Sequence, residues 1–414
     1  MAAKRLCILV ALAALLLLAG ADGLRTDARQ PAPVPGLQSG EPTADAGSGS
    51  QQVPIPSPSP LHPREHEGWQ KGFAFWSQTP AFGSRHSFAA LRRLKAAGAN
   101  TVSPVITWYL AHPYDVRLHP GRGTPADDEL VAAVDEAHRL GLQVVLRFHV
   151  DCEDGSWRAR INPDDKDALF TAYSAVLNHY ADLAQAHGVE GMVIGAELSS
   201  LTGPAYTSYW RSMIAEVRRR FGGFLTYSAQ WGSAPPSSEH DQYREFEQIE
   251  FWQELDYLGI SAYFELAQDG QSAPSRQELL ARWDEWRRLR IEPFQARYGM
   301  PLLFTEVGYP SSQEAARHPW NGSPYVQVNL QLQADLYSAL FESWSEVPWF
   351  GGAYLWFWPT DLDAGVPVDS DYPPVGKPAE QVLRDWHQLL DDMERTTSLK
   401  PADAGGTIPP GEGR

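Results

Sequence analysis

Eight short apolar runs alternate with amphipathic stretches through the middle of this sequence, and this alternation limits the possible folds more than any other feature. The intervening stretches carry apolar residues at the three- and four-residue spacing of helices, as in the segment after residue 163. Strands that alternate with helices are typical of a parallel sheet covered by helices. The eight runs cover residues 71–76, 100–106, 142–149, 190–196, 224–229, 255–263, 301–306 and 351–358.

The number of strand–helix units favours a closed barrel over an open sheet. No Gly-x-Gly-x-x-Gly motif follows the first run, and the sequence contains no phosphate-binding loop. We therefore predict an α/β protein with a single (β/α)8 TIM barrel over residues 68–392. The helix between the second and third runs is expected to begin with Thr124 as its N-cap and Pro125 at its first position. Functional residues of such a barrel lie at the C-terminal ends of its strands.

The two flanks of the predicted barrel differ from it in composition. Lys4 and Arg5 precede an apolar run at 6–19, and Ala19-Gly20-Ala21 fits a signal peptidase site, so residues 1–21 are predicted to be a signal peptide. The apolar run is shorter than the roughly 20 residues that span a bilayer, which makes a retained anchor the less favoured alternative. Residues 22–67 form a predicted Pro/Ser/Gly-rich linker and residues 393–414 a predicted disordered tail. We expect a secreted, periplasmic or cell-surface protein.

The charge and the aromatic content indicate which partners to expect. A formal net charge of −17 disfavours nucleic acid and anionic membranes as partners. The chain contains 15 Trp, 16 Tyr and 16 Phe, and aromatic rings stack well on neutral sugar rings. We expect a polysaccharide or oligosaccharide substrate, no nucleic acid, no membrane contact after signal cleavage, and a monomer.

Motifs for other chemistries are missing from the sequence. It contains no His-Glu-x-x-His or Gly-x-Ser-x-Gly motif and no Cys-x-x-Cys pair, and Cys152 is interpreted as a packed thiol. We therefore predict no cofactor and no metal. A group of aspartates after the last run could hold calcium but lacks the full loop pattern, so a solvated acidic loop is favoured at Asp361, Asp363, Asp369 and Asp371.

Two of the apolar runs end in a glutamate. Glu197 follows the fourth run and Glu306 ends the seventh. A single glutamate at a strand end is usually an ion-paired or helix-capping residue. A pair of glutamates on opposite sides of a barrel mouth is harder to explain in this way. An ionised carboxylate at an apolar rim costs several kcal/mol of stability unless a function requires it. Two carboxyl groups about 5–5.5 Å apart are what a retaining glycosidase requires.

Motifs in seven of the runs resemble those of the glycoside hydrolase clan with an acid/base glutamate after strand four and a nucleophile glutamate after strand seven. Within this clan, the sequence looks most similar to glycoside hydrolase family 113, whose characterised members are mainly endo-acting β-1,4-mannanases. The resemblance covers about residues 69–390. Its motifs are NTVSPVITWY, LRFHVDCEDGSWRARINP, VIGAEL, YSAQW, LGISAYF, FTEVGYP, and AYLWFW followed by GKPA.

The resemblance implies roles for individual residues. Glu197 would be the acid/base and Glu306 the nucleophile, and the hydroxyl of Tyr263 would hydrogen-bond the nucleophile and orient it. Trp356 or Trp358 would form the floor under the sugar that is cleaved.

Three positions depart from the pattern of the relatives. Ala196 precedes the acid/base where most of the clan has Asn, Arg147 stands where Lys is expected, and Gln230 stands where Asn is usual. These departures leave the glycosidase class intact, but they make the identity of the sugar an open question.

Residues near the other strand ends are candidates for substrate binding. Arg147 and His149 are two residues apart, so both should point into the barrel. An Arg–acid pair that only stabilises the barrel is the alternative. The loop after the third run and the ends of the first, second and fifth runs should line the same cleft, although each aromatic residue alone could be loop packing. These candidates are Asp151, Trp157, Arg158, Trp76, Trp108, Tyr109 and Trp231.

The sequence therefore predicts a secreted retaining glycosidase that cleaves a neutral β-1,4-linked polysaccharide, with endo-β-1,4-mannanase activity on mannan or glucomannan favoured. Two alternatives remain. One is a carbohydrate-binding barrel without turnover, which the three departures would support. The other is a retaining β-glycosidase that acts on another β-linked glycan.

Overall fold

A computed structural model describes residues 68–232, 244–268, 274–322, 326–362 and 369–398. The predicted signal peptide and the predicted linker lie outside the described residues, as does the tail from residue 399. None of the helices in the described ranges combines the length and the apolar character that a membrane crossing requires.

The described strands form a closed parallel barrel, which confirms the predicted fold. Each barrel strand pairs in parallel with the next, and β1 pairs with both β2 and β9 to close the ring. The short strand β3 (His119–Pro120) pairs antiparallel with β2 outside this ring. The eight barrel strands are β1 (Gln70–Trp76), β2 (Thr101–Leu110), β4 (Gln143–Cys152), β5 (Gly191–Ala196), β6 (Phe224–Gln230), β7 (Leu258–Ser261), β8 (Leu302–Val307) and β9 (Phe350–Pro359).

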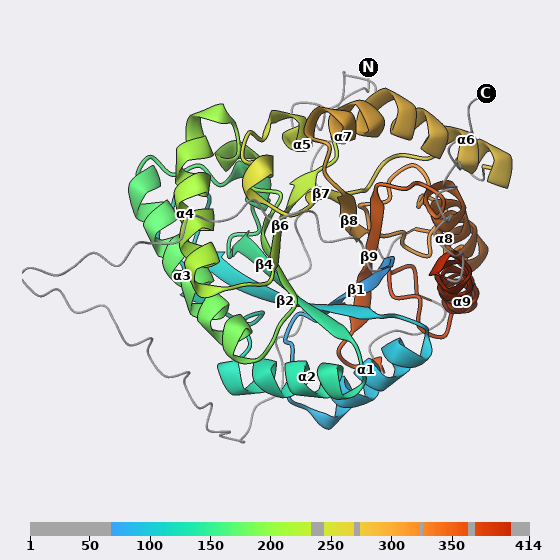
Figure 1. Cartoon of the computed structure of the whole chain (residues 1–414), viewed down its shortest axis with the longest axis horizontal. Helices are drawn as coiled ribbons and strands as arrows, with labels where there is room; N and C mark the ends of the chain where they lie inside the picture. Colours follow the sequence, from blue (N-terminus) through green and yellow to red (C-terminus); the bar gives the residue numbers. More distant parts are fainter. Residues whose placement is uncertain (1–67, 233–243, 269–273, 323–325, 363–368, 399–414) are drawn as a thin grey trace, which may run out of the picture. The chain divides into compact units, whose positions relative to one another are not determined.

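Helices surround the strands, as Figure 1 shows, and bury their apolar faces against the outside of the barrel. They are α1 (Arg85–Ala96), α2 (Asp127–Arg139), α3 (Lys166–Ala186), α4 (Thr207–Arg220), α5 (Glu245–Gln248), α6 (Arg276–Trp286), α7 (Glu292–Tyr298), α8 (Leu330–Trp344) and α9 (Pro378–Ser398).

The start of α2 differs from the prediction. The helix begins at Asp127, and its N-cap residue Ala126 makes no side-chain cap. Three acidic residues in its first turn interact favourably with the helix dipole instead. The hydroxyl of Thr124 bonds to the carbonyl of Thr107 in β2 and accepts a hydrogen bond from the amide of Gly121. Thr124 therefore stabilises the loop before the helix and does not cap it.

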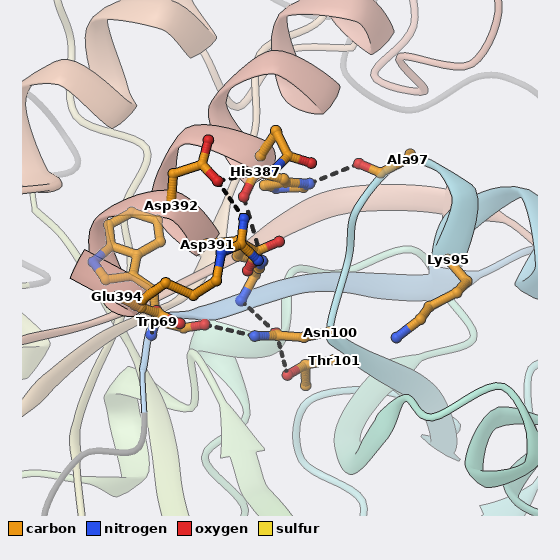
Figure 2. Close-up of polar contacts among 12 residues, drawn as sticks. Trp69, Lys95, Ala97, Asn100, Thr101, His387, Asp391, Asp392 and Glu394 are labelled. Atoms are coloured by element: carbon orange, nitrogen blue, oxygen red, sulfur yellow. Dashed lines mark hydrogen bonds and ion pairs between the residues drawn. The ribbon is translucent and has the colours of Figure 1, made fainter. Parts of the chain in front are cut away.

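The C-terminal boundary of the barrel also differs from the prediction. The tail was expected to begin at residue 393, but α9 continues to Ser398. The reason is a tertiary contact: Oε1 of Glu394 accepts a hydrogen bond of 2.6 Å from the amide of Trp69, at the start of the barrel (Figure 2). An exposed polar sequence is thus held in the helix by the chain segment that enters β1.

The last turns of α9 fasten it to the N-terminal ends of the first strands. The ammonium group of Lys71, in β1, pairs with Asp391 and lies 3.4 Å from the carbonyl oxygen of His387. The imidazole Nδ1 of His387 lies 2.8 Å from the carbonyl oxygen of Ala97, a contact drawn in Figure 2. Burial lowers the pKa of His387 from 6.5 to about 4.

This shift predicts a loss of stability in acid. Between pH 6.5 and 4 the unfolded chain binds a proton at this histidine and the folded chain does not, so the free energy of unfolding falls as the pH falls, by about 3 kcal/mol from this group. His387→Gln, which keeps a donor for Ala97, should reduce the difference in unfolding free energy between pH 7 and pH 4 by about this amount. Denaturant unfolding at both pH values measures it. The exposed His86→Gln is the control, and an equal effect of both variants would contradict the prediction.

Candidate active site

Glu306 faces the barrel mouth because of an irregularity in β8. Phe304 packs against Trp283 of α6 and Trp344 of α8, so strict alternation would also point Glu306 towards the helices. The register of β8 shifts against β9 between Phe304 and Val307. Phe304 pairs with Ala353 and Val307 pairs with Leu355, so β8 carries one extra residue here. Such a bulge reverses the alternation and turns the Glu306 side chain inward.

Both carboxyl oxygens of Glu306 accept a hydrogen bond from a buried side chain. Nη1 of Arg147 donates to Oε2 at 2.7 Å, and the hydroxyl of Tyr263 donates to Oε1 at 2.5 Å. Arg147 is fully buried, and Glu306 is its ion-pair partner. The acid that the Arg–acid pair requires is therefore the same glutamate that the sequence predicts as the nucleophile. A guanidinium and a phenol on either side hold Glu306 as an oriented carboxylate.

His149 lies beside this pair on β4. Its Nε2 is 3.9 Å from Oε2 of Glu306, and its ring stacks on Trp356 with the centroids 5.9 Å apart. Burial, followed by the positive charges of Arg158 and Arg147, lowers the pKa of His149 well below its ordinary value. The imidazole is therefore neutral and offers a hydrogen-bonding group without a charge.

Glu197 directly follows β5 and has a left-handed backbone, with φ of +54°. A non-glycine residue in this region is strained and persists only where its neighbours fix it. Here the amide of Glu197 donates to the carbonyl of Ser228 at 2.9 Å. Burial, and next the negative charge of Glu306, raise the pKa of Glu197 to about 7. The site thus combines one carboxyl group with a raised pKa and a second one that is paired with an arginine.

The loop after β4 contributes a second cation. Asp151 lies in β4 and not in the loop, where the sequence placed it, and accepts a hydrogen bond of 2.9 Å from Nε of Arg158. The positive charge of Arg158 opposes the rise in the pKa of Glu197. Trp157 is half-buried next to Arg158. The structure thus links the Asp151–Arg158 pair electrostatically to the two carboxyl groups.

Two groups of aromatic rings flank the carboxyl groups. On one side Trp356 lies against His149 and against Trp76, whose ring centroid is 5.5 Å away. On the other side Trp231 lies 5.5 Å from Tyr263 and 5.5 Å from Trp320. Among the predicted aromatic residues, Trp76, Trp231 and Trp356 are therefore brought to the carboxyl pair.

Two predicted substrate contacts, Trp358 and Trp108, point to the helix layer. Trp358 is fully buried, and its indole nitrogen donates a hydrogen bond to the carbonyl of Ala90 in α1. Its side chain points outward because β9 carries an extra residue opposite β1. The indole of Trp108, which lies within β2, contacts the hydroxyl of Tyr180 in the helix layer. The ring of Tyr109 stacks on His119 of β3, and Tyr109 is in register with Asp151 of β4. Its contact with the substrate stays a prediction.

Sequence reasoning missed a chain of hydroxyl groups beneath Glu197. Thr305 donates to Ser228 at 2.8 Å, the hydroxyls of Ser228 and Ser261 are 2.9 Å apart, and Ser261 hydrogen-bonds Glu197. Ser261 is two residues before Tyr263, so the alternation of the sixth run could have indicated it. Trp320 was also missed, because it lies in the long loop after β8, where the sequence shows no strand or helix periodicity.

The site offers no evident metal cage. Within the ranges that the structure describes, no group of three or more His, Cys, Asp or Glu side chains is placed to hold a metal ion. Of the four aspartates after β9, Asp363 lies outside the described residues, and Asp369 pairs with Lys377. Cys152 is buried, and burial raises the pKa of its thiol to about 12, which suits a packed thiol.

Comparisons with known proteins agree with this geometry. The family model described as Glycoside Hydrolase Family 113 matches residues 68–377. Among curated proteins, the sequence comparison found no match.

Two solved structures from that family are similar to the chain. One is the β-mannanase AaManA from Alicyclobacillus acidocaldarius in complex with ManMIm, with 28% identity, a TM-score of 0.67, and coverage of 78% of this chain and 98% of that chain. The other is a GH113 β-1,4-mannanase with 29% identity, a TM-score of 0.66, and coverage of 78% and 99%. A family 5 mannosidase from Rhizomucor miehei, with 12% identity, a TM-score of 0.54 and coverage of 81% and 98%, shares the fold.

Proposed function

The chain belongs to glycoside hydrolase family 113, and from this premise we propose that it is a secreted, retaining endo-β-1,4-mannanase that acts on mannan or glucomannan. Membership of the family makes it a glycoside hydrolase with a carbohydrate substrate. The mannan specificity is supported by the similar solved structures, which are described as β-mannanases. Export is supported by the signal peptide that the sequence predicts at residues 1–21.

The observation that carries the proposal is the contrast between the two carboxyl groups. Glu306 is held as a carboxylate by Arg147 and Tyr263, whereas burial and the charge of Glu306 raise the pKa of Glu197 to about 7. A retaining glycosidase needs one ionised and one protonated carboxyl group at the same pH. The contrast between Glu306 and Glu197 supports these two roles.

The mechanism follows from these two states. Glu306 attacks the anomeric carbon while Glu197 protonates the departing glycosidic oxygen, which forms a covalent glycosyl ester. Glu197, now ionised, removes a proton from water, and the water displaces Glu306 from the sugar. Arg147 and Tyr263 orient the nucleophile throughout, and Trp356 offers a flat surface for the sugar ring.

Two departures from the clan bear on how the sugar is bound. Ala196 carries no group that could hydrogen-bond the sugar 2-hydroxyl, so this contact comes from another residue or is missing. The Gln230 side chain is fully buried, and its oxygen accepts a hydrogen bond of 3.3 Å from Ser199. Gln230 is therefore engaged with the loop after Glu197. We propose that these departures alter specificity and leave catalysis in place.

A screen of reducing-sugar release tests the proposal directly. Mannan and glucomannan should be cleaved to oligosaccharides, whereas cellulose, xylan and chitosan should be cleaved much more slowly. Fast release from one of the latter alone would keep the enzyme class and change the substrate. Binding to polymers without release from any of them would favour the carbohydrate-binding alternative and contradict the proposal.

Tyr263→Phe tests the hydrogen bond to the nucleophile. The variant loses a donor that favours the ionised form of Glu306, so the acidic limb of the pH profile should move to higher pH and turnover should fall about 10- to 100-fold. The pH dependence of kcat/KM on a soluble mannooligosaccharide measures both effects. Tyr337→Phe, which alters a buried tyrosine of α8 that packs against Tyr309, is the control and should leave the acidic limb in place. An unchanged acidic limb in Tyr263→Phe would contradict the role of this hydroxyl.

A further inference from the structure

A third carboxylate, Glu245, is buried close to the two catalytic ones. It is the first residue of α5 and only 2% exposed. Its Oε1 accepts hydrogen bonds from the hydroxyls of Thr202, at 2.8 Å, and Tyr227, at 2.7 Å, and its Oε2 accepts one of 2.8 Å from the amide of Gln230. Every one of these partners donates, which is the arrangement that suits an ionised carboxylate.

The charge of Glu245 is not offset in the usual way. Within the described part of the chain, no salt bridge to it is found. Burial raises its pKa, and the hydrogen bonds that it accepts act in the opposite direction. A buried carboxylate stabilised by hydrogen bonds alone is costly, which points to a function for Glu245 at this position.

Tyr227 connects Glu245 to the backbone next to Glu197. The Tyr227 hydroxyl donates to Glu245 and accepts a hydrogen bond of 2.7 Å from the amide of Leu198, the residue after Glu197. On the other side, the amide of Glu197 donates to the carbonyl of Ser228. Adjacent residues of β6 thus hold the peptide groups on both sides of the left-handed Glu197, whose conformation requires such fixing.

We propose that Glu245 is a positioning residue for the acid/base carboxyl group, acting through Tyr227 on the backbone at Glu197 and through its own negative charge. The inference rests on the proposed function, because it takes Glu197 as the general acid. The two catalytic carboxyl groups do not account for this role. Glu245 fixes the orientation of Glu197, and its negative charge disfavours the ionisation of Glu197.

Several groups from different elements act on Glu197, and the sign of the charge effect follows from them. Burial and Glu306 raise its pKa most, and Glu245 raises it further, while Arg158 and the hydrogen bond from Ser261 lower it. Arg147, Tyr263 and Tyr372 also interact with Glu197 through charge. Removing the charge of Glu245 should therefore lower the pKa of Glu197.

Glu245→Gln tests the charge. The alkaline limb of kcat/KM on a mannooligosaccharide reports the loss of the proton from the general acid, so it should move to lower pH by about 0.5 to 1 unit. Glu247→Gln is the matched control, since it removes the same charge from the same helix at a residue that pairs with Arg290 at 2.6 Å. Its alkaline limb should stay in place. A folded Glu245→Gln enzyme with an unmoved alkaline limb would overturn the proposal.

Tyr227→Phe tests the backbone connection and decides the question if Glu245→Gln does not fold. The variant keeps the Glu245 carboxylate but leaves the amide of Leu198 without its acceptor. The orientation of the Glu197 carboxyl group towards the leaving oxygen should therefore be less well fixed. Because only a poor leaving group needs the acid, kcat on mannooligosaccharide should fall about tenfold, while the first step on an activated aryl mannoside should change less than about twofold. Equal losses on both substrates would indicate a structural role alone and overturn the inference.

The outcomes for Glu245 and for the proposed function can be told apart. If the wild-type enzyme releases no sugar, or if Glu197→Ala does not depend on the leaving group, the proposed function fails. If wild type and Glu197→Ala behave as expected but Glu245→Gln and Tyr227→Phe match wild type, only the role of Glu245 fails.

Discussion

Glu306→Ala should lose activity by about 10⁴-fold or more on both polysaccharide and aryl glycoside substrates. The reason is that no other described carboxylate in the site is held as Glu306 is, with both oxygens bonded by Arg147 and Tyr263, and without it no covalent intermediate forms. The loss should therefore be independent of the leaving group. Initial rates of reducing-sugar and phenolate release measure it.

Azide provides a second readout of the same variant. A small anion can occupy the space of the missing carboxylate and attack the sugar directly, so at most the inverted glycosyl azide should form. Glu314→Ala, a glutamate that pairs with Arg317 beyond β8, is the control and should keep its turnover. Substantial aryl glycoside hydrolysis by Glu306→Ala would show that another group is the nucleophile.

Glu197→Ala should respond to the leaving group in the opposite way. Cleavage of polysaccharide, whose departing alkoxide needs a proton, should fall by about 10³-fold or more, whereas the first step on an aryl glycoside with a phenolate leaving group should persist. The glycosyl-enzyme should then accumulate, because the base that activates water is also missing. A burst of phenolate followed by slow turnover, together with the mass of the labelled protein, measures this.

Azide should rescue Glu197→Ala with the opposite stereochemistry from Glu306→Ala. The anion needs no base to attack the intermediate, so turnover should recover and the glycosyl azide should keep the configuration of the substrate. If the two variants respond alike to leaving group and azide, or if the wild-type product first appears as the inverted anomer, the assignment of roles to the two glutamates is wrong.

The sequence determined the barrel because the signals for it are local. Each of the eight predicted runs overlaps a barrel strand, and the period of two within the 142–149 run correctly placed Arg147 and His149 on the inner face. Glu197 and Glu306 could be singled out because the C-terminal ends of parallel strands meet at one mouth. For the same reason Tyr263, after the sixth run, could be expected near them.

Only the tertiary structure decided which side chains reach the site, because bulges and long-range contacts have no local signature. Alternation would have pointed Glu306 outward and Trp358 inward, and a shift of register against a neighbouring strand reversed both. Glu245 stands in a short polar segment that resembles a solvated helix, and it becomes a buried partner of Tyr227 only when α5 packs against β6. The pKa of Glu197 likewise arises from burial and from a charge 109 positions away along the chain, which no window of sequence contains.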